Sequence, residues 1–168
     1  MRRDHSMKWL RLAGVAGFVI LSACTYAERQ KELAAPNGDL VPFEHVASAV
    51  LSPVDSPTYR VILNQETWAA AWSELVAEHW PPAPPAPSVD FQSHIIVFVG
   101  PGALPTQLQS FGVEEVRLLN GVLHVTILED WPSPRCGSLP VITRPVDIVS
   151  IPRLSTEAQF LTHRSSSC

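Results

Sequence analysis

The sequence predicts a single α+β domain in which one amphipathic helix packs against a mostly antiparallel sheet. Three observations support this fold class: a helical stripe within residues 65–79, a continuous apolar run at 94–100, and an Asn120-Gly121 turn between two strand-like segments. Proline accounts for 16 of the 168 residues, about twice the usual share, which disfavours a long helical bundle. We place the domain at residues 43–160.

The helix is expected to follow a short β-branched strand at residues 59–63. Asn64 stands at the N-cap position, and Glu66 places a carboxylate in the first turn, where it suits the helix dipole. Apolar residues then recur at helical spacing, at Trp68, Trp72, Leu75 and Val76. This stripe predicts a face packed on the core rather than a ligand platform. The prolines of residues 81–87 end the helix and predict a stiff crossover to the next strand.

The chain reads as β structure from residue 94 onward. The apolar run at 94–100 has the length of a strand and predicts a central strand covered on both faces. Asn120-Gly121 is a strong hairpin signal. Pro145 suggests a sheet edge or a bulge, because proline cannot donate to a ladder. The other strands are expected at residues 43–51, 115–119 and 122–129, with a further strand region at 141–142 and 146–151 that Pro145 interrupts.

Composition excludes some classes of function. Hydrophobic residues make up 46% of the chain, enough for a true core, so wholesale disorder is not expected. The formal net charge of −4 gives no electrostatic reason to bind nucleic acid.

Residues 1–23 form the most specific signal in the chain. Basic residues precede a ten-residue apolar segment at 12–21, as in a secretory signal peptide, and that segment is too short to span a membrane. Leu21-Ser22-Ala23-Cys24 then resembles the bacterial lipobox. This resemblance implies lipidation of Cys24 with fatty acids such as palmitate, and cleavage before it. Met7 is an alternative start codon, because the signal from there is still complete.

Residues 24–42 are expected to be a flexible tether between the lipid anchor and the domain. Thr25 follows the cysteine where an inner-membrane retention signal would have aspartate, which favours the outer membrane as the location in the cell envelope. Cleavage removes four basic residues and one acidic residue, and leaves 8 basic and 15 acidic side chains. Such an acidic body has no reason to lie flat on anionic lipid.

Residue types that perform chemistry occur without the spacing that would mark an active site. The histidines show no metal-ligand pattern, and no Gly-x-Ser-x-Gly elbow is present. We therefore expect no catalytic residue, no metal and no cofactor. The paired acids Glu114-Glu115 and Glu129-Asp130 are interpreted as solvated strand ends.

Cys136 and Cys168 are the only cysteines besides Cys24. In an oxidising envelope we expect them to form a disulfide that holds a C-terminal tail at residues 161–168, with a free C-terminal thiol as the alternative.

The loop at residues 100–111 contains glycines and prolines that prevent regular pairing. Leu104 and Leu108 are apolar residues in this loop, and loops held on a rigid scaffold often carry recognition. One hypothesis is that at least one leucine projects toward a partner, and the alternative is that both pack onto the core.

Residues 59–153 resemble the C-terminal domain family of protease complex subunit PrcB, found in bacterial lipoproteins. The matching segments, in order, are Asn64–Trp68, Val89–Phe91, Pro105-Thr106, Thr143–Pro145 and Ile148–Arg153. The family usually continues the Pro-Thr pair with Gly-Gly-Tyr, whereas this chain has Gln107-Leu108-Gln109, and it usually has Tyr where Val146 stands.

The resemblance implies an accessory, protein-binding role beside a protease, without catalytic residues or cofactor. We therefore expect a non-catalytic, lipid-anchored envelope protein with a protein partner. The alternative is a small-ligand-binding or metal-binding envelope lipoprotein, with a pocket lined by some of Trp68, Trp72, Trp131 and His124.

Overall fold

The computed structural model describes residues 37–76, 84–137 and 140–168. The signal peptide, Cys24 and most of the expected tether lie outside these residues. The elements, in chain order, are β1 (Asp39–Leu40), β2 (Glu44–Ala49), β3 (Thr58–Ile62), α2 (Gln65–Val76), β4 (His94–Gly100), β5 (Ser110–Leu119), β6 (Val122–Pro132), β7 (Val146–Pro152) and β8 (Ala158–Ser167).

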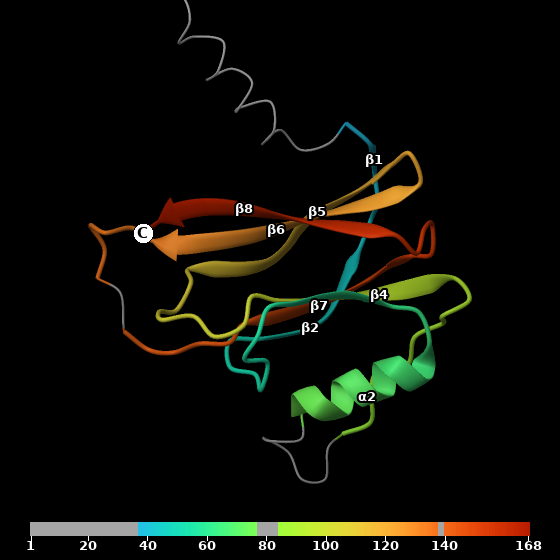
Figure 1. Ribbon diagram of the computed structural model, residues 1–168, viewed down its shortest axis with the longest axis horizontal. Coiled ribbons are helices and arrows are strands. Elements are labelled where there is room, and N and C mark those ends of the chain that lie inside the picture. Colours follow the sequence, from blue (N-terminus) through green and yellow to red (C-terminus); the bar gives the residue numbers. More distant parts are fainter. Residues whose placement is uncertain (1–36, 77–83, 138–139) are drawn as a thin grey trace, which may run out of the picture. The chain divides into compact units, whose positions relative to one another are not determined.

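The described strands form two four-stranded sheets (Figure 1). One sheet has the order β2-β7-β4-β3, and we call it the helix-covered sheet. The other has the order β1-β5-β6-β8, and we call it the C-terminal sheet. The predicted class holds in its coarse form, because the pairing is mostly antiparallel and one short helix is described. The sequence predicts one sheet, whereas the described strands form two.

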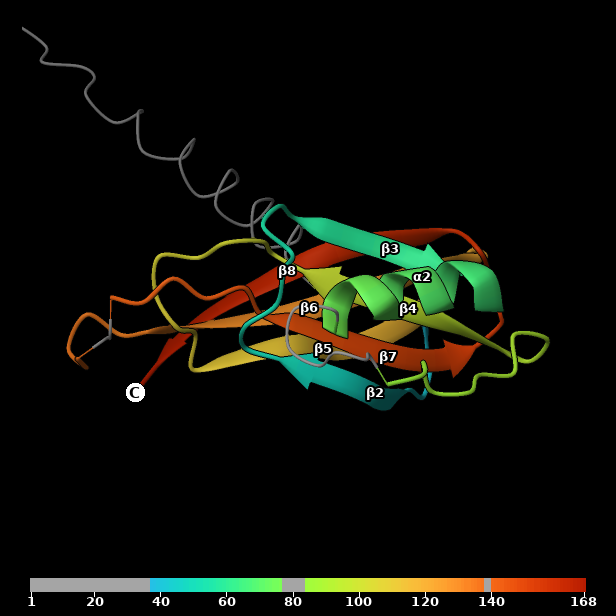
Figure 2. The same ribbon diagram turned by 90° about the horizontal axis from the view of Figure 1, so that it is seen from below.

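The central strands β4 and β7 of the helix-covered sheet are buried on both faces. Successive residues of β4 alternate between two apolar clusters: Ile95, Val97 and Val99 face the C-terminal sheet, whereas Ile96 and Phe98 pack with the helix. Figure 2 shows α2 in front of this sheet. The prediction of a central, doubly covered strand is confirmed.

Helix α2 begins as predicted, because the Asn64 side chain accepts the backbone N–H of Thr67 at 2.9 Å. Trp68 is fully buried, which confirms the core-facing stripe. Its Nε1 donates to the carbonyl of Pro87 at 2.8 Å, and Nε1 of the half-buried Trp72 donates to Pro84 at 2.9 Å. The described part of the proline segment thus supplies the acceptors that buried indoles require.

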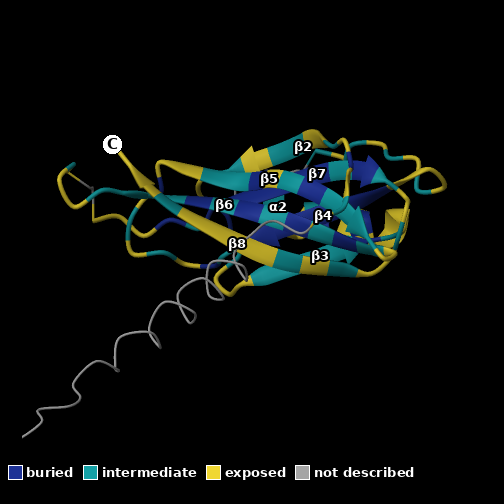
Figure 3. Ribbon diagram, turned by 90° about the horizontal axis from the view of Figure 1, so that it is seen from above, coloured by how far each residue is buried: buried dark blue, intermediate teal, exposed yellow. Residues whose placement is uncertain are grey.

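The C-terminal sheet is built on the predicted hairpin. Asn120 and Gly121 both have positive φ, at 51° and 80°, as a tight two-residue hairpin turn requires. Strand β8 then pairs with β6 in parallel along its whole length. Figure 3 shows mainly buried residues in β4 and β7 and mainly exposed ones in β8.

Three expectations need correction. Residues 161–168 are not a tail, because residues up to Ser167 belong to β8, and their pairing with β6 holds them in the sheet. The domain also begins before residue 43, since β1 pairs with β5. Pro145 does not mark an edge strand: it precedes β7, which lies between β2 and β4.

Cys136 and Cys168 form a disulfide with their Cα atoms 5.7 Å apart. It joins the end of β8 to the segment that follows β6.

Candidate functional site

Three connections meet at one end of the sandwich. They are residues 50–57 between β2 and β3, residues 101–109 between β4 and β5, and residues 140–145 before β7. We call this the three-loop end. It includes most of the loop that the sequence singled out.

Backbone hydrogen bonds tie these loops to one another. They join Leu104 N to Thr143 O (2.8 Å), Thr143 N to Leu104 O (3.0 Å), Arg144 N to Val50 O (3.1 Å) and Ala103 N to Asp55 O (3.0 Å). The guanidinium of Arg144 also forms an ion pair with the Asp55 carboxylate. Cross-linking of this kind holds irregular backbone in one shape, so the three-loop end presents a defined surface.

Exposed aliphatic side chains gather at this end. Among the described residues, seven large apolar side chains are exposed, and four of them belong to the three-loop end. These four are Val50 (50% exposed), Leu51 (55%), Val141 (42%) and Ile142 (62%). Single exposed apolar residues are ordinary, whereas a cluster of them on bonded loops is typical of an interaction site.

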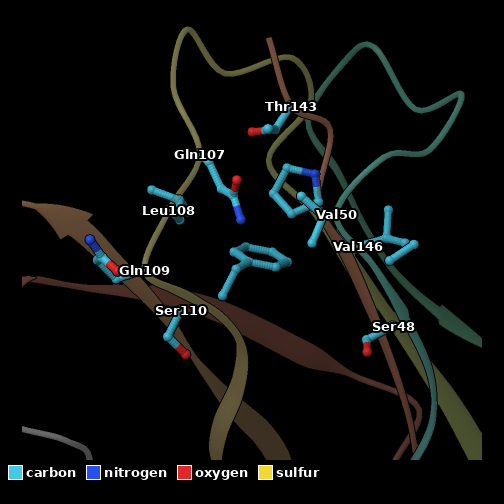
Figure 4. Close-up of a pocket in the computed structure, with 11 residues that line it drawn as sticks. Ser48, Val50, Gln107, Leu108, Gln109, Ser110, Thr143 and Val146 are labelled. Carbon is cyan, nitrogen blue, oxygen red and sulfur yellow. The ribbon is translucent and has the colours of Figure 1, made fainter. Parts of the chain in front are cut away.

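A pocket of about 260 Å³ lies beside this cluster. Its walls come from the end of β2, the 101–109 loop, the start of β5 and the residues before β7 (Figure 4). Gln107 extends toward the middle of the pocket, with Thr143 and Ser110 on opposite sides of it. None of the lining residues is charged. The pocket therefore offers apolar contact and neutral hydrogen-bonding groups.

The two loop leucines differ. Leu108 is only 8% exposed and belongs to the buried apolar set. Leu104 is half-buried and forms the isolated bridge to Thr143. Leu108 is therefore buried and does not project toward a partner. A contribution of Leu104 to partner binding stays a prediction.

A buried carboxylate, that of Asp147, forms a hydrogen bond between the two sheets near the pocket. Asp147 of β7 is 1% exposed and accepts the backbone N–H groups of Val113 (2.8 Å) and Ile148 (3.1 Å). Its Oδ1 also lies 3.0 Å from Nδ1 of His45. A Cβ at residue 112 would lie 2.8 Å from Asp147 Oδ2, so glycine is needed there. Because its oxygens are occupied inside the sandwich, we interpret Asp147 as a structural link between the sheets.

The paired acids are held by specific partners. Arg117 donates from Nε and Nη2 to Glu115 at 2.6 and 2.7 Å, and this bonding lowers the pKa of Glu115. Glu114 Oε2 lies 2.7 Å from His163 Nδ1. For Glu129 the prediction of a solvated strand end is wrong. This residue is only 3% exposed, and its carboxylate accepts a hydrogen bond from Arg164 Nε at 3.0 Å.

The residues proposed for a small-ligand pocket do not come together. Trp68 and Trp72 pack under the helix, whereas Trp131 and His124 lie on β6 of the other sheet. None of the four lines the pocket at the three-loop end or a second pocket between α2 and β3. Among the described residues, no group of three or more His, Cys, Asp or Glu side chains is arranged to hold a metal ion.

Sequence reasoning missed the four exposed aliphatic residues, Asp147, and Arg60, which lines a second pocket. Asp147 and Arg60 share a signal, because each is a charged residue inside an apolar strand segment.

No protein-family model, curated protein or solved structure matches this chain. The described part of the chain has no helix with the length and apolar character needed to cross a membrane.

Proposed function

We propose that this protein is a lipid-anchored envelope protein that binds a protein partner through its three-loop end and catalyses no reaction itself. The observation that carries the proposal is the cluster of Val50, Leu51, Val141 and Ile142 on loops fixed by backbone hydrogen bonds. Fixed loops lose little entropy on binding, so apolar contact at this end converts efficiently into affinity.

The chemistry of the surface defines the partner. The pocket has no charged lining residue, and the charges of Arg144 and Asp55 at this end are paired with each other. A neutral, largely apolar segment of a protein suits this surface, with Gln107 as a hydrogen-bonding group for its backbone. Binding should therefore change little with ionic strength, unlike association between charged surfaces.

The resemblance to PrcB supports a role as the accessory subunit of a protease. Gln107, Leu108 and Gln109 stand where that family usually has Gly-Gly-Tyr, and all three line the pocket. We propose that these substitutions adapt the pocket to a different partner segment.

The partner proposal is tested by affinity capture of the full chain from solubilised envelope after crosslinking. Leu51→Asp with Ile142→Asp should reduce capture of the principal partner at least tenfold, because two contact side chains become charged. Leu154→Asp is the matched control, since Leu154 is 54% exposed, like Leu51 at 55%, but follows the opposite end of β7. All variants should keep the wild-type melting temperature, because the altered side chains are exposed.

Equal capture by the double variant and by wild type would exclude the three-loop end as the binding surface. Recovery of the wild-type protein alone after crosslinking would count against any stable protein partner.

Anchoring is tested separately. Thioether formation needs the Cys24 thiol, so Cys24→Ala should abolish incorporation of labelled palmitate and release the protein from the membrane fraction. A Cys24→Ala protein that still incorporates the label would refute lipidation at this residue.

A further inference from the structure

A second pocket, of about 240 Å³, lies on the outer face of the helix-covered sheet. Its floor is formed by Arg60 of β3 and Phe98 of β4, which lie directly opposite each other in the ladder. One wall is the second half of α2, with Glu74 and Leu75. The other wall is the segment 53–56. The pocket is thus bounded by a strand, a helix and a loop.

Arg60 is a cation without an ion pair within the described residues. Its guanidinium carbon lies 5.0 Å from the centroid of the Phe98 ring, so the ring covers one face of the group. Its Nε is buried and has no hydrogen-bond partner. A buried donor without an acceptor is costly, and native proteins rarely leave one unsatisfied. The floor of the pocket therefore holds a positive charge that no carboxylate of the described residues pairs with.

Two carboxylates line the same pocket, and neither is paired with Arg60. Asp55 is engaged by Arg144. Glu74 is exposed on the helix wall and has no ion pair among the described residues. The pocket therefore presents one unpaired cation on the strand and one unpaired carboxylate on the helix, with the apolar surface of Phe98 and Leu75 between them.

We propose that this pocket binds a small zwitterion, a free amino acid with an apolar side chain. Its carboxylate would accept from Arg60, its ammonium group would donate to Glu74, and its side chain would lie on Phe98 and Leu75. A carboxylate matches the planar donors of a guanidinium and supplies the counter-charge that Arg60 lacks among the described residues.

The lining disfavours the other classes of small ligand. Glu74 and Asp55 repel a dianion such as a phosphate ester, and Arg60 repels a simple cation. The volume is below the roughly 300–1,000 Å³ of pockets for drug-sized ligands, which favours a molecule the size of an amino acid. This site is independent of the three-loop end and goes beyond the proposed partner binding.

The test measures binding of L-leucine and the other standard amino acids to the full chain in detergent, by isothermal titration calorimetry. Two probes dissect the zwitterion: 4-methylpentanoate keeps the carboxylate of leucine without its ammonium, and 3-methylbutylamine keeps the ammonium without its carboxylate. At least one apolar amino acid should bind saturably. For leucine as that ligand, each probe should bind about tenfold more weakly or worse.

Variants place the ligand in the pocket. Arg60→Gln and Glu74→Gln should each weaken binding about tenfold or more, whereas Arg135→Gln, which removes the same charge from an exposed site outside this pocket, should leave it within about twofold. Melting temperatures of all variants confirm that they are folded. The Leu51→Asp, Ile142→Asp double variant should bind the amino acid normally, which separates this site from the partner surface.

The proposal is overturned if no amino acid binds saturably, or if binding survives both Arg60→Gln and Glu74→Gln. Equal affinity for leucine and 4-methylpentanoate would show an anion site and would overturn the assignment to Glu74.

Discussion

Strand β4 of the helix-covered sheet and strand β8 of the C-terminal sheet are held in place by different forces. In the helix-covered sheet, β4 is buried on both faces, and its residues from Ile95 to Val99 are all 2% exposed or less. In the C-terminal sheet, β8 is an edge strand whose second half reads Thr-His-Arg-Ser-Ser-Ser. Apolar burial stabilises the first strand, whereas polar contacts and a disulfide hold the second.

The contacts of β8 show how an edge strand with little apolar surface is fixed. Ser165 and Ser167 donate their hydroxyl groups to the Asp130 carboxylate, and Arg164 donates to the buried Glu129. The disulfide then joins Cys168 to Cys136. The difference teaches that one strand can be held by solvent exclusion and another by local polar bonding, and the two strands should respond to different perturbations.

The largest effect is expected from Trp68→Ala in the helix layer. Removal of this fully buried indole leaves a cavity and takes away the donor to Pro87. Chemical denaturation should show a loss of about 3–5 kcal/mol in the free energy of unfolding. Trp131→Ala, which truncates a half-buried tryptophan at the end of β6, should cost clearly less. Equal losses of unfolding free energy in the two variants would contradict the stronger apolar anchoring of the helix layer.

A smaller effect is expected from Cys168→Ser. The disulfide closes a loop with a sequence separation of 32 residues, for which the chain-entropy model gives about 3–4 kcal/mol as an upper value. Hydrogen exchange should increase mainly at residues 162–167, because these residues have little apolar anchoring, and little at 95–99. Reduction of the wild type should produce the same pattern and should add nothing to the variant. Uniform loss of protection in both sheets would contradict this account.

The smallest effect concerns the pH dependence of Asp130→Asn. Hydrogen bonds from Ser167 and Ser165 lower the pKa of Asp130 below its ordinary value of 3.8. The folded state therefore binds this proton less readily than the unfolded chain does. The contribution of Asp130 to stability is fully present at pH values well above its ordinary pKa of 3.8. It is lost as the pH falls through the lower pKa that Asp130 has in the folded state.

Unfolding of wild type and Asp130→Asn should therefore differ at neutral pH and converge in acid, measured by denaturation from about pH 6 to about pH 2. Ser165→Ala should show part of the same effect. Ser166→Ala, an exposed serine beside it, should behave as wild type. A difference that persists unchanged at the acid end would exclude ionisation of Asp130 as its cause.

The parts of the fold that were predicted correctly are those specified by neighbouring residues. The apolar run of β4, the Asn64 cap and the Asn120-Gly121 turn each act over a few positions, and each appears as expected. Strand β8 has no apolar alternation in its second half, so only its pairing with β6 identifies it as a strand. The division into two sheets was missed for the same reason, since it depends on pairing between distant segments.

The candidate site was predicted in part. The loop with Leu104 and Leu108 does lie at the three-loop end, but burial removes Leu108 from the exposed surface. The sequence predicts a strand at residues 43–51 that ends with Val50 and Leu51, whereas β2 ends at Ala49 and both side chains are exposed. The sequence alone does not show whether an aliphatic side chain is buried or exposed. Here its exposure depends on how the three loops pack together.

The pairing of distant strands also constrains when the molecule can fold. His45 of β2 meets Asp147 of β7 across 102 residues of sequence, and β8 supplies the last strand of the other sheet. The helix-covered sheet is complete only after β7 has emerged, and the C-terminal sheet only after β8 has emerged. The disulfide also needs Cys168, which follows β8. Such non-local topologies fold slowly. A chain exported from its N-terminus would therefore cross its membrane before its sheets close, and would acquire its structure only after the final strand arrives.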